Sequence, residues 1–194
     1  MADLEKVKQL REETAVSLGE CRKALEESAG DIQKAKDLLR KMGRNLAEKR
    51  ISKDAKSGIV YSYLHSNNRV GVMIELRCES DFVANSEDFR NLAHEISLQI
   101  ASMNPKFISS EDITEEDLAK EKEIYAEQIK TSGKPAAMAE KIMEGKINKY
   151  KEENSLMTQA WVKDNTKTIK DLFDEVVAKI GEKIKVSKFV RYEI

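Results

Sequence analysis

Residues 70–79 alternate strictly between apolar and other side chains, and this pattern limits the possible folds more than any other part of the chain. Because successive side chains of a strand point to opposite faces, a period of two predicts a β-strand with one buried face. Residues 58–65 supply the other arm of a hairpin, since Ser66-Asn67-Asn68 suits a tight turn. Residues 184–192 alternate again, so the sequence predicts a third strand.

Residues 1–43 have the spacing of three short amphipathic helices instead. Ser17-Leu18-Gly19-Glu20 forms a capping box at the start of the second helix, and Gly30 ends it. Asp31 caps the third helix, and Gly43 closes the bundle. The apolar stripes that define the three helices consist of Leu4, Val7, Leu10, Cys21, Ala24, Leu25, Ile32, Ala35, Leu38, Leu39 and Met42.

The remaining chain divides into a basic linker with some helical content, residues 44–56, and a core, residues 57–194. Helices are expected from about residue 86, from residue 114 and, after a break at Gly133 and Pro135, to about residue 153. Their apolar positions include Phe89, Leu92, Ala93, Ile96, Ile100, Leu118, Tyr125 and Ile129. A last helix follows Thr168, with Leu172, Val176, Val177 and Ile180 inward. The predicted fold class is α+β, a three-helix bundle plus a three-stranded antiparallel sheet packed with helices.

The composition excludes several classes of protein. Of the 194 residues, 36% are charged and the formal net charge is −1, so a dedicated duplex-binding protein is not expected. No apolar run approaches the roughly 20 residues of a membrane span, and the acidic start resembles no signal peptide. Cys21 and Cys78 lie far apart, which argues against a disulfide framework or a zinc cluster. The sequence therefore predicts a cytoplasmic protein without membrane contact.

No motif for enzymatic chemistry is present. The chain has neither G-x-x-x-x-G-K-[ST] nor G-x-G-x-x-G, so we do not expect it to bind nucleotide phosphates itself. His65 and His94 are isolated and have no cysteine at a ligand spacing, so a surface or interface role is preferred to a metal site. The sequence thus predicts a protein that is not an enzyme and has no metal or cofactor.

The most informative side chain is Phe82, on the connection Ser80-Asp81-Phe82-Val83 between the second strand and the following helix. One interpretation is structural: Phe82 packs against the helix entry, and Asp81 accepts hydrogen bonds from the free amides there. Spacing alone favours this interpretation. The other is functional: Phe82 is an aromatic anchor presented to a pocket of a partner, with a carboxylate beside it.

Several separated motifs, in a fixed order, resemble the translation elongation factor Ts family in its short form. The bundle carries Val7-Lys8-Gln9-Leu10-Arg11-Glu12-Glu13-Thr14 and Cys21-Arg22-Lys23-Ala24-Leu25, followed by Gly30-Asp31. The core carries Ser80-Asp81-Phe82-Val83-Ala84 and ends with Phe189-Val190-Arg191-Tyr192-Glu193. The resemblance spans the whole chain, and the order of the matches makes it far more specific than any single motif.

The resemblance implies a guanine-nucleotide exchange factor for elongation factor Tu. The bundle would be a ubiquitin-associated-like domain that docks on the GTPase through Arg11 and through Leu18-Gly19, which replace a methionine pair of the family. Ser80, Asp81, Phe82 and Val83 would intrude near the magnesium site of the GTPase and promote release of GDP, so that GTP rebinds; serine replaces the family's threonine. Long members duplicate the core, whereas short members form homodimers.

Two other classes of function fit parts of the sequence. An adaptor of the ubiquitin-binding type would explain the bundle but not the core after residue 57. An RNA-binding factor is suggested by the basic run in residues 41–56, but a solvated linker explains that run more simply, and the run lacks aromatic residues that stack on bases. The expected partners are therefore elongation factor Tu and a second copy of the chain, without direct nucleic-acid contact.

Overall fold

The computed structural model describes residues 3–49, 53–131 and 136–194. The predicted α+β class is confirmed: three packed N-terminal helices precede a three-stranded antiparallel sheet packed against helices. By the density of contacts, the chain divides into two units. One consists of residues 1–97 together with 170–194, and the other consists of residues 98–169.

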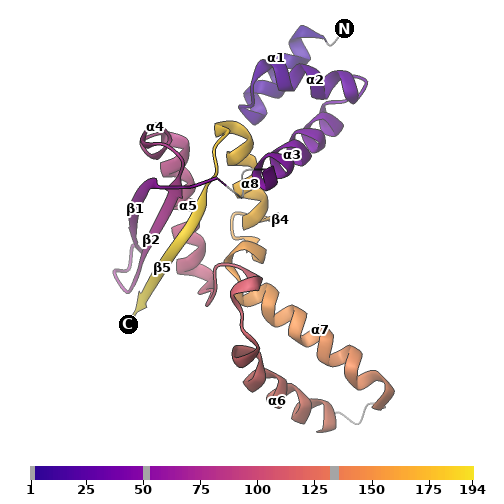
Figure 1. The fold of residues 1–194 in the computed structure, drawn as a ribbon, viewed down its shortest axis with the longest axis vertical. Helices are drawn as coiled ribbons and strands as arrows, with labels where there is room; N and C mark the ends of the chain where they lie inside the picture. The colour runs from indigo at the N-terminus through magenta and orange to yellow at the C-terminus, as the bar shows by residue number, and fades with distance from the viewer. Residues whose placement is uncertain (1–2, 50–52, 132–135) are drawn as a thin grey trace. The chain divides into compact units, whose positions relative to one another are not determined.

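The N-terminal bundle consists of α1 (Leu4–Thr14), α2 (Leu18–Glu27) and α3 (Ile32–Lys49) (Figure 1). At the start of α2, the Glu20 amide donates to Ser17 Oγ at 3.3 Å, and the Ser17 hydroxyl donates to the Glu20 carboxylate at 2.8 Å. The Lys34 amide donates to the Asp31 carboxylate at 3.1 Å, which caps α3 as predicted. The turn before it needs a glycine, because Gly30 has φ +81.

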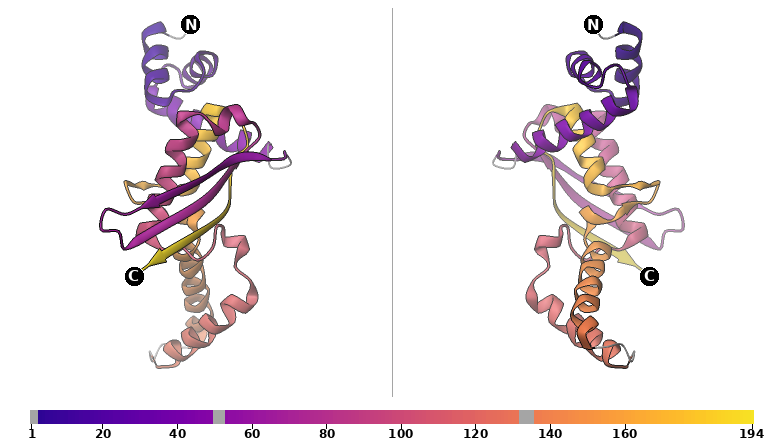
Figure 2. Two further views of the ribbon diagram at one scale, coloured as in Figure 1. Left: turned by 90° about the vertical axis from the view of Figure 1, so that its left-hand side faces the viewer. Right: turned by 90° about the vertical axis from the view of Figure 1, so that its right-hand side faces the viewer.

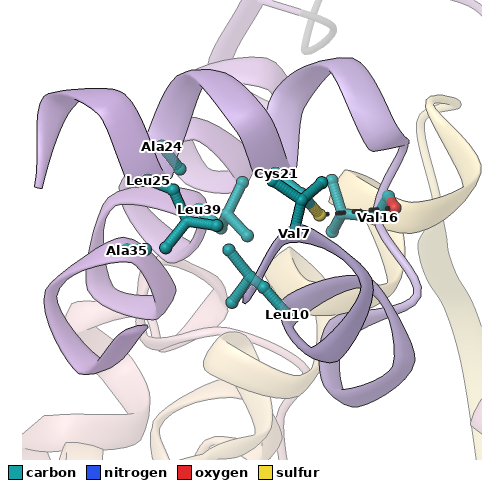
Figure 3. Packing of buried hydrophobic residues seen from close by; sticks show 8 residues of the cluster. All are labelled: Val7, Leu10, Val16, Cys21, Ala24, Leu25, Ala35 and Leu39. Atoms are coloured by element: carbon teal, nitrogen blue, oxygen red, sulfur yellow. Dashed lines mark hydrogen bonds between the residues drawn. The ribbon is translucent and has the colours of Figure 1, made fainter. Parts of the chain in front are cut away.

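The bundle has its own small hydrophobic core, in which side chains from all three helices point toward one another (Figure 3). Leu4 is 68% exposed and does not belong to it, so the predicted stripe of α1 is wrong at that position. The Cys21 thiol lies in this core and donates to the Val16 carbonyl at 3.6 Å. The buried residues are Val7, Leu10, Val16, Cys21, Ala24, Leu25, Ala35 and Leu39.

The third helix does not end at Gly43, as the sequence predicted, but continues to Lys49. Gly43 is buried where α3 crosses α8 (Ile169–Ile180). A Cβ at Gly43 would lie 2.7 Å from the Asp174 carbonyl oxygen and 2.8 Å from Ala178 Cβ. The glycine therefore marks a close approach of two helices and not a helix end. Nearby, Arg40 of α3 lies 3.3 Å from the Glu175 carboxylate of α8.

The main sheet has the order β1-β2-β5, with all pairs antiparallel: β1 (Ser57–Leu64), β2 (Val70–Cys78) and β5 (Lys185–Glu193). The predicted hairpin and third strand are confirmed. Asn68 in the turn has φ 56, the left-handed region that asparagine tolerates. On the inner face of β2, the alternation buries Val72, Ile74, Leu76 and Cys78.

Within the first unit, helices pack on the inner face of this sheet (Figure 2). The short α4 (Asp81–Ala84) follows β2 directly and leads into α5 (Glu87–Met103), which lies against the sheet. The Tyr61 hydroxyl of β1 lies 3.1 Å from His94 Nδ1 of α5. On α8 the buried apolar side chains are Ile169, Phe173 and Val177. The prediction is thus confirmed at Val177, whereas the other predicted positions, Leu172, Val176 and Ile180, are only half-buried. Helical periodicity alone does not separate two adjacent stripes on an apolar helix.

The second unit contains the pair α6 (Glu115–Thr131) and α7 (Ala136–Asn154) and a small hairpin of β3 (Ala160–Trp161) and β4 (Asp164–Thr168). The sequence did not predict that hairpin. Short 3-10 turns occur at Ser110–Asp112 and Leu156–Thr158. The predicted break at Gly133 and Pro135 lies outside the described residues. In the part of the chain that the structure describes, no helix has the length and hydrophobicity needed to cross a bilayer.

Candidate partner-binding site

The segment predicted to contact a partner forms α4, a single helical turn between β2 and α5 (Figure 1). Two neighbouring side chains in this turn have opposite environments. Val83 is 6% exposed and anchors the turn to the protein, whereas Phe82 is 87% exposed. An aromatic ring left almost fully in water gains no stability from its apolar area. Phe82 therefore does not pack against the helix entry, and the structural interpretation of this residue is wrong.

Ser80 is the N-cap of this turn. Its hydroxyl oxygen accepts from the Val83 amide at 3.3 Å, and its O–H group donates to Glu182 Oε1 at 2.7 Å. The hydroxyl thus satisfies one of the free amides at the start of the helix, a role that the structural interpretation gave to Asp81. The Asp81 carboxylate lies exposed beside Phe82.

Glu182 binds the backbone of this connection. It is distant in the sequence, just after the end of α8. Its Oε2 accepts from the Glu79 amide at 3.2 Å and from the Ser80 amide at 3.0 Å. In return, Glu79 Oε1 accepts from the Lys183 amide at 2.7 Å. Sequence reasoning missed this pair of carboxylates, because no local pattern places residue 182 beside residue 80.

Cys78 completes the anchoring of Ser80. Its buried thiol donates to the Ser80 carbonyl oxygen at 3.2 Å. Burial, and then the nearby charge of Glu182, raises the pKa of the Cys78 thiol to about 11. The thiol therefore keeps its proton at neutral pH and remains a hydrogen-bond donor.

The other end of the turn is also fixed. The Asn85 side-chain amide donates to the Asp81 carbonyl oxygen at 2.9 Å, and the Ser86 hydroxyl donates to the Val83 carbonyl oxygen at 2.8 Å. Ser86 then accepts from the Phe89 amide at 3.3 Å and caps α5. Phe82 is thus an exposed apolar side chain on a backbone held at both ends, which is the form of a preorganised interface anchor.

The second predicted set lies on the bundle and not on α4. Arg11 is exposed in the last turn of α1. Leu18, 46% exposed, and Gly19 are the first two residues of α2. A Cβ added at Gly19 would meet no atom within 4 Å, so the surface there is open.

Metal ligands do not gather at either position. Among the residues that the structure describes, no group of three or more His, Cys, Asp or Glu side chains has the arrangement to hold a metal ion. The two sets present exposed side chains to solvent, namely an aromatic ring, a leucine and a guanidinium.

Comparison with known proteins gives one consistent family. The family model described as Elongation factor TS matches residues 4–194. The elongation factor Ts of Thermosipho melanesiensis is 48% identical over 188 residues, covering 97% of this chain and 96% of that protein. That of Petrotoga mobilis is 50% identical over 191 residues, covering 98% and 97%, and that of Thermodesulfovibrio yellowstonii is 52% identical over 188 residues, covering 97% and 94%. With matches of this extent along both chains, this protein belongs to the elongation factor Ts family, in its short form.

Proposed function

We propose that this chain acts in the cytoplasm as the guanine-nucleotide exchange factor of elongation factor Tu, and that it does so by inserting Phe82 near the magnesium site of the GTPase. An elongation factor Ts exchanges the nucleotide of elongation factor Tu during translation elongation and is not an enzyme. The observation that supports the finer mechanism is the 87% exposure of Phe82 on an anchored turn.

The mechanism requires no covalent step. A factor that weakens nucleotide binding to the GTPase is itself bound less tightly when nucleotide is present, because the coupling between two sites is reciprocal. A magnesium ion that bridges the GTPase and the diphosphate is a large local charge. Weakening its coordination by ~1.4 kcal/mol lowers nucleotide affinity tenfold. GDP then leaves, and GTP fills the empty site and releases the factor.

Within the proposed site, the four residues have different roles. Phe82 displaces groups near the magnesium ion, because it is the side chain that projects. Ser80 and Val83 hold the turn, through the N-cap hydrogen bond and through burial. Asp81 orients the loop or pairs with a group of the partner, since its exposed carboxylate lies next to the ring.

A separate contact is proposed for the N-terminal bundle. Arg11, Leu18 and Gly19 would dock it on the GTPase, with residues 1–43 as a ubiquitin-associated-like domain. Residues 44–56 would be the linker, and residues 57–194 the core that carries Phe82. The exposure of Arg11 and Leu18 supports this division of labour, because neither side chain is used by the bundle core.

The test of this function is release of labelled GDP from purified elongation factor Tu. We expect catalytic amounts of the protein to accelerate release, and the protein without the GTPase to bind neither GDP nor GTP, since its sequence has no phosphate-binding loop. Stopped-flow fluorescence gives the first result and calorimetry the second. Unchanged GDP release at micromolar protein would refute the proposal.

We further propose a homodimer, formed by the open face of the sheet. Residues on this face follow the register of the strands: Ser62 lies opposite Met73, Met73 opposite Val190, and Gly71 opposite Tyr192. Exposed apolar side chains gather at one end of the face, and Glu75, which pairs with Lys188 at 3.1 Å, lies beside them. The exposed apolar residues are Val60, Leu64, Met73, Val190 and Tyr192. In a two-fold symmetric dimer, the commonest kind of oligomer, the same patch on a second copy would cover these side chains.

Met73→Glu is expected to convert the dimer to a monomer. Met73 is 50% exposed, so a lone chain tolerates the charge, but an interface would bury it without a partner. Met138→Glu on α7, where the methionine is 55% exposed, is the matched control and should remain dimeric. Sedimentation at tens of micromolar protein checks both. A monomeric unchanged protein at that concentration would show that this face has no second copy.

A further inference from the structure

We infer that Glu182 is a positioning residue for Phe82: its carboxylate holds the backbone of Glu79 and Ser80 and so fixes the direction of the aromatic side chain before a partner binds. This inference rests on the function proposed above, in which Phe82 is the inserted group.

The argument starts from the exposure of Phe82. A buried side chain is oriented by its neighbours, but a ring that is 87% exposed has almost no packing to fix it. What the protein fixes is therefore the direction of its Cα–Cβ bond, which the backbone of α4 sets and which limits the rotamers that the ring can adopt. That helix has 4 residues, too few to be stable without tertiary contacts. Whatever holds the ends of α4 thus determines where Phe82 points.

At the N-terminal end, the backbone leaves the sheet and loses its ladder partners. The strand β2 ends at Cys78, so the amides of Glu79 and Ser80 need other acceptors. Glu182 Oε2 accepts from the two amides, at 3.2 Å and 3.0 Å, and Glu182 Oε1 accepts from the Ser80 hydroxyl at 2.7 Å. Hydrogen bonds to a charged acceptor are stronger than neutral ones. One carboxylate therefore fixes three donors on two successive residues.

The remaining polar groups of Ser80 are also used. Its carbonyl oxygen accepts from the Cys78 thiol at 3.2 Å and from the Ala84 amide at 3.1 Å. Its hydroxyl oxygen accepts from the Val83 amide. The amide, the carbonyl and the hydroxyl of Ser80 all form hydrogen bonds, and Phe82 lies only two residues further along the chain. Within this set, Glu182 is the group that comes from a distant part of the sequence.

Glu182 is itself presented by a defined turn. Gly181 has φ +80 and its amide donates to the Val177 carbonyl at 2.8 Å, which ends α8 in a left-handed cap. The next amide but one, that of Lys183, donates to Glu79 Oε1 at 2.7 Å. The two segments therefore hold each other through a pair of glutamates, each of which accepts from the backbone of the other segment.

The decisive experiment is a double-mutant cycle on GDP release, with the maximal rate and the half-saturating concentration of factor measured separately. For Glu182→Ala we expect a maximal rate about tenfold lower, because losing ~1.4 kcal/mol of preference for one orientation is a factor of ten. The half-saturating concentration should change little, since the bundle contacts remain. Glu182→Gln keeps one carbonyl acceptor and should lose less. Glu152→Ala, an exposed glutamate of α7, is the control.

If Glu182 acts only through Phe82, the two substitutions are not additive: Phe82→Ala with Glu182→Ala should be no slower than Phe82→Ala alone. Without any GTPase, hydrogen exchange of the Glu79 and Ser80 amides should be faster in Glu182→Ala and Glu182→Gln, but not in Glu152→Ala. That measurement follows the hydrogen bonds from the Glu79 and Ser80 amides to residue 182 directly, and amides elsewhere in the core show whether Glu182→Ala also lowers global stability.

The outcomes separate this inference from the function on which it rests. A slow Phe82→Ala protein together with Glu182→Ala and Glu182→Gln proteins of normal rate would keep the proposed function and overturn the positioning role. Fully additive losses would also overturn it. A Phe82→Ala protein of normal rate would overturn both.

Discussion

Phe82→Ala is expected to release GDP from elongation factor Tu at about one tenth of the rate of the unchanged protein, or more slowly. Truncating an aromatic interface anchor typically costs ~2 kcal/mol or more, and ~1.4 kcal/mol already corresponds to a tenfold effect. Binding to the GTPase should persist, because the contacts proposed for Arg11 and Leu18 lie on the bundle. Rates and half-saturating concentrations from stopped-flow fluorescence give both values on one sample.

The folded state should not change, since a side chain that is 87% exposed contributes little to the core. Val83→Ala is the matched control in the same turn: Val83 is 6% exposed, so its truncation should lower the melting temperature. Asp81→Ala should slow exchange less than Phe82→Ala, because its role is orientation. A destabilised Phe82→Ala protein whose folded fraction exchanges at the normal rate would exclude insertion of the ring.

The elements that local patterns define were predictable from the sequence. The alternation of residues 70–79 and 184–192 predicts strands, and Ser17 and Asp31 mark helix starts, because both kinds of signal depend on residues a few positions apart. For Phe82 only the order of several motifs favoured the functional interpretation over the structural one, and its role at a partner stays a prediction. Its exposure then removed the structural interpretation.

What could not be predicted depends on contacts between distant residues. Ser80 and Glu182 are 102 residues apart, and no periodicity connects a residue after a helix to a residue after a strand. On α8 the prediction is right for Val177 but misses Phe173, because periodicity alone does not decide which of two adjacent apolar stripes is the more deeply buried. Gly43 resembles the end of a helix because glycine often ends helices, whereas here it allows two helices to approach.

The close approach at Gly43 leads to the second large effect. Gly43→Ala is expected to destabilise the protein by up to about 2 kcal/mol. Alanine favours a helix over glycine by ~1 kcal/mol, but overpacking a tight contact costs about 1–3 kcal/mol. The new Cβ would lie 2.7 Å from the Asp174 carbonyl oxygen, a backbone atom of α8 that moves only with its helix. The clash should therefore outweigh the gain in helix propensity.

Gly145→Ala separates the two contributions, because Gly145 also lies inside a helix, α7, but a Cβ added there would meet no atom within 4 Å. At that position only the propensity remains, so we expect a gain of up to ~1 kcal/mol. Opposite signs in urea unfolding followed by circular dichroism would establish that α3 and α8 are in contact at Gly43. Two gains of equal size would mean that α3 and α8 can separate at Gly43 without loss of stability. The N-terminal bundle would then have no close contact at this point with α8, the helix that precedes Glu182.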